Sequence, residues 1–345
     1  MQNKFTNLSS PLANKLETKG DEYLYFGGTA YLGIPQHQLF TELYLKGLKK
    51  YGLNNGTSRG NNVQLGIYNE VEKYAADRYG AQDALITSSG YLAAQLTVKE
   101  FSKYGEIRYA PNSHPALWQN EAPKIDTTFK DWSVNIIEEI NKSDKENWLI
   151  ISNSMNNLYP EIYDFSFVKQ LNKRTLLIID DSHGIGINNN GSGAYTSIPQ
   201  SENIEVVVVA SMAKALGVDA GLILGSAKNI GQLKKSNEFL GASPPSAAGL
   251  YAFKNADDIY KKELNTINLH IDSLSKLLYG NPEWHFIPKF PVFFSKNADL
   301  SIKLLEKNIL VSSFPYPDKD GPIVNRIVLS SWHTQTDIQK LIEAL

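Results

Sequence analysis

The stretch VVVVASMAKALGVDAG, residues 206–221, decides the fold that we predict for this chain. Four consecutive valines followed by Ala210 are typical of a strand that is buried on both faces. Such strands occur where helices cover both sides of a mostly parallel sheet. Lys214 follows this strand, three residues after Ser211 and among small side chains, so we expect it to lie near an interior cleft.

Apolar segments alternate with helical patterns along the middle of the chain. A helical periodicity covers residues 63–79, and a shorter one covers residues 165–172 just before the next apolar run. This alternation predicts an α/β fold with a doubly wound or related sheet. The predicted strands are 84–87, 148–152, 175–181, 204–211 and 221–225.

The pattern changes in the C-terminal part of the sequence. Residues 228–278 are rich in helical signals, and short strands are predicted around 286–294 and 323–331. A length of 345 residues suits one large domain with a smaller one. We predict an N-terminal arm that forms part of the small domain (1–44), a large domain (45–245) and a C-terminal small domain (246–345).

Composition narrows the classes of function. With 42% hydrophobic residues, 20% charged residues and a net charge of −2, the chain is typical of a globular protein without a basic nucleic-acid face. It has no cysteine, which excludes disulfides, a thiolate nucleophile and zinc–thiolate sites. The sequence shows neither a signal peptide nor a membrane-spanning run, so we expect a cytoplasmic protein with small-molecule substrates.

Polar residues follow the apolar strand TLLIIDDSHGIG, residues 175–186. The strand ends in Asp180 and Asp181, and His183 comes three residues after the first aspartate. Ligand sites of α/β folds form at the carboxyl ends of strands. Alternatively, the aspartates cap the next element and His183 packs in the core.

The S-x-x-K spacing of Ser211 and Lys214 has three interpretations. A serine acyl-enzyme of the penicillin-binding type also requires S-D-N and K-T-G tripeptides, and neither occurs here. A Schiff-base lysine fits better, because burial makes an ammonium group easier to deprotonate. The third interpretation is a solvated helical lysine, which the apolar strand before it disfavours.

The segment ITSSGYLAAQ, residues 86–95, reads as a strand, a turn and the start of a helix. Free N–H groups at a helix start bind phosphate, Gly90 permits close backbone approach and Ser89 adds a hydroxyl. A phosphate cradle, an acid at a strand end and a buried lysine are together the parts of a pyridoxal phosphate site. No metal site is predicted, because the histidines lack ligand spacing.

At these residues the chain resembles the α-oxoamine synthases, a family of fold-type-I pyridoxal phosphate enzymes, and within it most resembles the 8-amino-7-oxononanoate synthases. The resemblance runs from about Tyr25 to Leu345 and rests on motifs in the family order. It implies a fold-type-I transferase with a mostly parallel sheet of the seven-stranded type, helices on both faces and a smaller α+β domain. The motifs are FGGTAYLGI, NNGTSRGNNVQLGIYNEVE, SSGYLAAQ, PNSHPALW, DDSHG, SMAKALG and RIVLSSWHTQTDIQKLIEAL.

The resemblance also implies roles for individual residues. Lys214 would form the Schiff base and act as general base, Asp180 would pair with the pyridine nitrogen, and His183 would contact the phenolic oxygen. His114 would stack on the cofactor ring, and Arg326 would bind the substrate carboxylate. The other residues implied at the cofactor are Ser89, Gly90, Tyr91, Asn157 and Ser211.

The resemblance implies decarboxylating condensation of an amino acid with an acyl-CoA to an α-amino ketone, in a homodimer. The alternatives are an aminotransferase of class I/II or a C–C lyase acting on a small amino acid, and a cofactor-bearing protein without turnover. The chain departs from the family pattern at Thr29, where we expect substrate contact, at Asn157 and at residues 240–243. His333 is expected to pack or cap in the closing motif.

Overall fold

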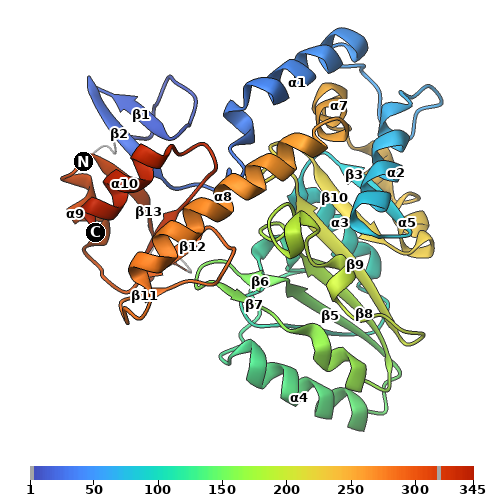
Figure 1. The fold of residues 1–345 in the computed structure, drawn as a ribbon. Coiled ribbons are helices and arrows are strands. Elements are labelled where there is room, and N and C mark those ends of the chain that lie inside the picture. The colour runs from blue at the N-terminus through green and yellow to red at the C-terminus, as the bar shows by residue number, and fades with distance from the viewer. Residues whose placement is uncertain (1–3, 317–319) are drawn as a thin grey trace. The chain divides into compact units, whose positions relative to one another are not determined.

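The computed structural model describes residues 4–316 and 320–345, which form two compact units (Figure 1). Unit 1 comprises the described residues up to Gln38, Asn157–Glu161 and the described residues from Asp258 onward, and unit 2 comprises Leu39–Asn156 and Ile162–Asp257. The boundaries predicted from the sequence lie at 44/45 and 245/246. In the structure, the chain passes between units after Gln38 and after Asp257, where a long helix, α8, begins.

Unit 2 is built on a six-stranded sheet with helices around it (Figure 1). Five strands are parallel to one another, and β10 is antiparallel to both of its neighbours. The order across the sheet is β3 (Asp83–Thr87), β10 (Gly221–Gly225), β9 (Ile204–Ser211), β8 (Arg174–Asp180), β5 (Asn147–Asn153) and β4 (Glu106–Tyr109).

The observed sheet confirms the α/β prediction and refines it in two ways. Within the described residues it has six strands, one fewer than the seven-stranded type. Strand β10 is antiparallel because residues 212–220 are too few for a crossover, which needs about a dozen residues or more. The sequence predicts the strand 221–225, and the structure adds its direction.

The central strands are buried on both faces, as the valine run predicts. Leu176, Leu177, Ile178 and Ile179 of β8 are all 0% exposed. Since side chains alternate along a strand, this pattern requires a covering layer on each side of the sheet. On one side, Leu176 and Ile178 share a core with Ala93 of α3 and with alternate residues of the neighbouring strands.

Helices surround the sheet of unit 2. The helix predicted over 63–79 begins at Ile67, directly after Gly66. Residues before it form a turn, in which Oδ1 of Asn61 accepts a hydrogen bond from the Val63 backbone N–H. The helical signal at 165–172 forms a 3₁₀ helix, Phe165–Gln170, in which Asp164 caps the first turn. The α-helices are α1 (Gln38–Tyr51), α2 (Ile67–Tyr79), α3 (Gly90–Phe101), α4 (Phe129–Lys142), α5 (Ala227–Leu233), α6 (Asn237–Gly241) and α7 (Ala247–Lys254). Further 3₁₀ helices are Ile34–Gln36, Pro115–Leu117, Asn189–Gly191 and Tyr195–Ser197.

Unit 1 contains a second six-stranded sheet, in which β2 and β13 are parallel and the other pairs are antiparallel. Its helices are α8 (Asp257–Leu278), α9 (Leu300–Leu305) and α10 (Gln335–Ala344). The sheet order is β1 (Lys15–Thr18), β2 (Asp21–Phe26), β13 (Ile309–Pro315), β14 (Ile323–Val328), β12 (Val292–Ser295) and β11 (Trp284–His285). A two-stranded ribbon, β6 (Met155–Asn156) with β7 (Glu161–Ile162), completes the strands of the described residues.

The helices show no transmembrane character. Within residues 4–316 and 320–345, none is both long and apolar enough to cross a membrane. The longest, α8, carries charged residues along its length, and its buried residues follow a one-sided helical pattern.

The buried middle of β8 gives a stability prediction. Ile178 is 0% exposed in the core of unit 2, so Ile178→Ala should lower the free energy of unfolding by about 2–5 kcal/mol. Ile162, in the same unit, is 54% exposed, and Ile162→Ala is the matched control with an expected change within about 0.5 kcal/mol. Urea unfolding followed by circular dichroism measures both. Equal effects of the two substitutions would contradict the buried position of Ile178.

Candidate active site

The carboxyl ends of three parallel strands meet in unit 2. Asp180 ends β8 and lies in register with Asn153 of β5 on one side and with Val209 of β9 on the other. The turn after Asp180 carries His183, whose side chain is half-buried. The sheet therefore brings the predicted acid and histidine to the same edge as the end of β9, where the segment with Lys214 begins.

Ser182 fixes this edge and is not among the residues predicted from the sequence. Its backbone N–H donates to Oδ1 of Asp180 at 2.8 Å, and its hydroxyl accepts from the Ser211 backbone N–H at 2.8 Å. These bonds tie the turn after β8 to the last residue of β9. Its place between Asp180 and His183 in the motif was the available signal.

Lys214 lies in the turn that joins β9 to β10. Its side chain is half-buried, and burial holds the pKa of Lys214 below its ordinary value, although the Asp180 carboxylate acts to raise it. The turn is closed by two backbone hydrogen bonds, from Met212 to Ala220 and from Val218 to Met212. A half-buried lysine with a lowered pKa beside a carboxylate is suited to proton transfer.

His114 shares the electrostatic environment of this group. Burial lowers the pKa of His114, Asp180 acts to raise it and Lys214 acts to lower it. Its Nδ1 accepts a hydrogen bond from Ala116 N–H at 3.1 Å, so the neutral ring carries its proton on Nε2. Asn153, the strand-end neighbour of Asp180, holds the histidine by accepting from the His114 backbone N–H at 3.0 Å.

The first turn of α3 faces the ends of β9 and β10. Ser89 caps the helix by accepting from Leu92 N–H at 3.1 Å. A Cβ on Gly90 would lie 2.5 Å from Cα of Ser211, and a Cβ on Gly221 would lie 2.2 Å from the Ser89 carbonyl oxygen. Only glycine fits at these contacts, which place the free N–H groups of the helix start beside the strand ends.

These residues fit pyridoxal phosphate. The start of α3 with Ser89, Gly90 and Tyr91 offers N–H donors and hydroxyl groups to a phosphate, and Tyr91 is 59% exposed. The close packing of Gly90 on Ser211 brings this anion site to the strand that leads to Lys214. An amine, a carboxylate and an anion site therefore lie within one unit, as this cofactor requires.

Three of the predicted residues belong to unit 1. Thr29 is half-buried and its carbonyl accepts from Tyr31 N–H at 2.8 Å. Arg326, on β14, is 7% exposed and donates from Nη1 to the Asn157 carbonyl at 2.8 Å. Burial lowers the pKa of Arg326 from its ordinary value. The structure thus brings Arg326 and Asn157 together, through the backbone of the latter.

His333 packs in the core of unit 1, in agreement with the prediction from the closing motif. It is 3% exposed and stacks on Phe26 with ring centroids 4.3 Å apart. Its Nδ1 lies 3.0 Å from both the N–H and the carbonyl oxygen of Ser330, and its Nε2 lies 2.9 Å from the Tyr25 carbonyl oxygen. Burial lowers the pKa of His333 to about 4.

Asp181 is buried in the loop that follows β8. It is 1% exposed, and its Oδ2 accepts from Ala194 N–H at 2.8 Å. Burial raises the pKa of Asp181 to about 7, while the nearby Ser154 hydroxyl acts to lower it. A Cβ on Gly184 or Gly193 would lie 2.1 Å or 2.3 Å from its carboxyl oxygens, so the loop after β8 closes around this group.

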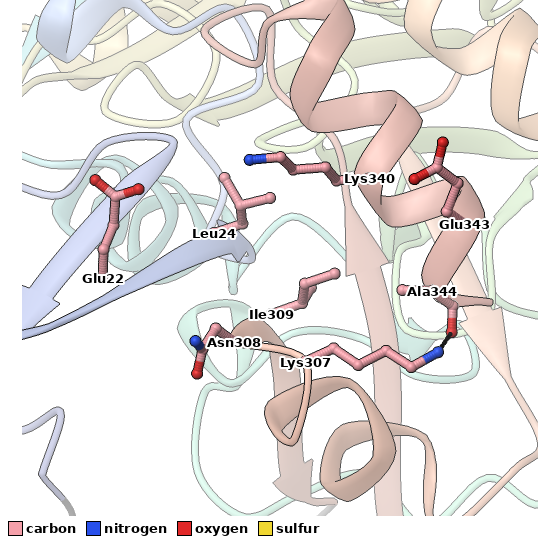
Figure 2. A pocket seen from close by; sticks show the side chains of 8 residues that line it. All are labelled: Glu22, Leu24, Lys307, Asn308, Ile309, Lys340, Glu343 and Ala344. Carbon is pink, nitrogen blue, oxygen red and sulfur yellow. Dashed lines mark hydrogen bonds between the residues drawn. The ribbon is translucent and has the colours of Figure 1, made fainter.

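One pocket of unit 1 is lined by none of the predicted site residues. It has a volume of about 490 Å³ and lies between β2, the start of β13 and α10. Its lining side chains are shown in Figure 2. Lys307 there donates to the Ala344 carbonyl at 2.8 Å, and Glu22 pairs with Lys15. Among the described residues, no group of three or more His, Asp and Glu is placed to bind a metal.

Comparison with protein families identifies the chain. The model for aminotransferases of class I and II matches residues 26–345. The chain belongs to the aminotransferase class I and II family. This family uses pyridoxal phosphate, in agreement with the residues at the edge of the unit 2 sheet. The predicted family resemblance and cofactor are thereby confirmed.

Relatives and solved structures extend over nearly the whole chain. The 8-amino-7-oxononanoate synthase of Petrotoga mobilis is 25% identical over 345 residues, which cover 94% of this chain and 87% of the relative. Serine palmitoyltransferase of Sphingomonas wittichii has a TM-score of 0.80 at 14% identity, covering 99% of this chain and 92% of that chain. An 8-amino-7-oxononanoate synthase of Francisella tularensis has a TM-score of 0.69 at 17% identity, covering 93% and 96%. These structural likenesses confirm the predicted fold.

The contact between Gly90 and Ser211 gives a prediction about cofactor affinity. The added methyl group of Gly90→Ala would meet the backbone at 2.5 Å and separate α3 from β9, at a cost of about 1–3 kcal/mol. We expect pyridoxal phosphate to bind about tenfold more weakly, as measured by quenching of intrinsic fluorescence. Gly231→Ala on α5 is the control, since nothing lies within 4 Å of that added methyl. An unchanged affinity of Gly90→Ala for pyridoxal phosphate would refute a phosphate site at the start of α3.

The buried His333 predicts a pH effect on stability. The unfolded ring takes up a proton below about pH 6.5, whereas the folded ring does so only near pH 4. The unfolded state thus binds more protons between these values, and stability falls as pH decreases through that window, by about 3 kcal/mol in total. His333→Gln should show a shallower decrease in urea unfolding between pH 7 and 4, and His37→Gln is the control. Equal slopes in wild type and His333→Gln would contradict this assignment.

Proposed function

We propose that this chain is a pyridoxal phosphate-dependent acyltransferase that condenses an amino acid with an acyl-CoA. The products are an α-amino ketone, free CoA and carbon dioxide. The observation that carries the proposal is the half-buried Lys214, whose pKa is lowered by burial and which interacts with Asp180 at the strand ends. The names of the relatives, 8-amino-7-oxononanoate synthases at 23–25% identity, favour acyl transfer over transamination.

Residues of unit 2 would hold the cofactor. The N–H groups of Gly90 and Tyr91 with the hydroxyls of Ser89 and Ser211 would bind its phosphate. The carboxylate of Asp180 would hold the proton of the ring nitrogen. Bound pyridoxal phosphate supplies an electron-withdrawing ring that stabilises negative charge at the carbon next to the amino acid nitrogen.

Lys214 would hold the cofactor through its amine and, when its amine is free, remove the proton from the amino acid Cα. Its lowered pKa makes the neutral amine accessible, because the charged form is disfavoured by burial. His114 is neutral, with Nδ1 fixed by Ala116, and would pack on the ring without adding a second positive charge. His183, in the turn after Asp180, would orient the phenolic oxygen of the cofactor.

Arg326 would bind the substrate carboxylate, because a guanidinium can donate two parallel hydrogen bonds to a carboxylate. Thr29 would contact the substrate, and Asn157 would lie near the cofactor. We propose that substrate choice differs from that of the relatives through Thr29, Asn157 and residues 240–243. We also propose that the chain acts as a cytoplasmic homodimer.

The proposal is tested by the visible absorption of the purified protein with pyridoxal phosphate, titrated with alanine, glycine and serine. Acyl-CoAs of increasing chain length are then added while free thiol is measured. We expect a long-wavelength absorption band that is lost in Lys214→Ala, and CoA release that depends on the amino acid. Asp180→Asn should lower the rate of CoA release by at least about 100-fold.

Lys99→Ala is the control for removal of a lysine, since Lys99 is exposed and pairs with Glu238. An absorption band without CoA release would refute acyl transfer and favour an aminotransferase or a C–C lyase. Absence of the band would refute the roles of Lys214 and of the phosphate-binding residues.

A further inference from the structure

A five-residue segment from the middle of the chain belongs to unit 1. Asn157–Glu161 clusters with this unit, although the residues on both sides of it belong to unit 2. Its contacts with the sheet of unit 1 are specific: the Asn157 carbonyl accepts from Arg326, and the Pro160 carbonyl accepts from His285 Nε2 at 2.8 Å. The segment is therefore held at two carbonyls, one on each side of Tyr159.

Four residues form a row across the sheet of unit 1. His285 of β11 lies opposite Phe294 of β12, Phe294 lies opposite Arg326 of β14, and Arg326 lies opposite Ser312 of β13. Directly opposite residues in antiparallel strands project from the same face. His285 and Arg326 therefore lie on one face, two strands apart, with Phe294 between them.

Tyr159 joins the segment to this row. Its ring stacks on His285 at a centroid distance of 3.5 Å and an interplanar angle of 8°, and it meets Phe294 edge-on at 5.4 Å. Tyr159 is nevertheless 43% exposed, so burial of apolar area contributes less here than in the core. The contacts instead fix where the carbonyls of residues 157 and 160 lie.

One hydrogen bond holds the Nη1 end of the Arg326 guanidinium. Nη1 donates to the Asn157 carbonyl, and the ring of Phe314 lies 5.1 Å from the guanidinium carbon. Nε is buried and, within the described part of the chain, has no hydrogen-bond partner. A buried N–H without a partner is costly, and a carboxylate that accepts from this edge would satisfy it.

We propose that His285 and Tyr159 are positioning residues for Arg326. They fix the segment Asn157–Glu161, so that the Asn157 carbonyl accepts the hydrogen bond from Nη1 of Arg326. The Nε–H side of the guanidinium can then donate to the substrate carboxylate. This inference rests on the proposed function, in which Arg326 binds the amino acid. Neither residue contacts the substrate, so both act through the orientation of a side chain that has many rotamers when free.

The inference predicts a selective loss of amino acid affinity. His285→Ala removes the hydrogen bond and the stacked ring, so the dissociation constant and KM for the amino acid should rise about tenfold. The value of kcat at saturating amino acid, the affinity for pyridoxal phosphate and the melting temperature should stay at wild-type values. His285→Gln retains an N–H donor for the Pro160 carbonyl and should recover part of the affinity, and Tyr159→Ala should resemble His285→Ala.

His37→Ala is the matched control, because His37 lies in the same unit and interacts with Glu263 at 3.5 Å, a contact outside this row. The dissociation constant is measured from the change in visible absorption of bound pyridoxal phosphate on adding amino acid, which needs no turnover. An unchanged constant in His285→Ala overturns the inference. So does a parallel loss of cofactor affinity and melting temperature, which would indicate a general structural role.

The two proposals fail in different ways. Wild-type protein that binds an amino acid but releases no CoA refutes acyl transfer, while the comparison of dissociation constants still decides the role of His285. Arg326→Lys, which keeps the charge and loses the bidentate edge, should weaken amino acid binding more than His285→Ala does. Wild-type protein that binds no amino acid overturns both proposals.

Discussion

The close approach of α3 to the ends of β9 and β10 is the constraint on which the candidate active site depends. Two glycines make it possible. A Cβ on Gly90 would overlap the backbone of Ser211, and a Cβ on Gly221 would overlap the backbone of Ser89. The helix start offers N–H groups, and β9 leads directly to Lys214. Without this contact the anion site and the amine would be separate features of an ordinary α/β sheet.

Burial then determines the charge of the groups around this edge. It lowers the pKa of Lys214 and His114 and raises that of Asp181, so each is shifted toward its neutral form. Asp180 acts to raise the pKa of both Lys214 and His114. The edge thus holds a proton-accepting amine and a neutral ring beside a carboxylate, an arrangement suited to a cofactor that is itself charged.

Much of this was predictable from local patterns, and the rest was not, for physical reasons. The valine run of β9 predicts a buried sheet strand, and the motif DDSHG predicts polar residues at the edge of the sheet. Both predictions are possible because the spacing of apolar residues is a local property of the sequence. Ser182 and Asn153 were missed because their importance lies in hydrogen bonds to residues far along the chain, Ser211 and His114 respectively. Strands β1, β2, β4 and β13 were also missed, because three are only partly buried and β2 is paired with a distant segment.

The pairing of β2 with β13 has a consequence for synthesis of the chain. Leu24 pairs with Ile309 in a parallel ladder, so the two strands of unit 1 are separated by nearly the whole sequence. The contacts within the sheet of unit 2 are complete by Gly225. During translation, the sheet of unit 2 can therefore form before β13 has been synthesised. Until then, the edge of β2 that pairs with β13 has unpaired backbone groups. Nascent chains that stop before residue 309 would expose this edge, which makes them targets for chaperones and prone to aggregation.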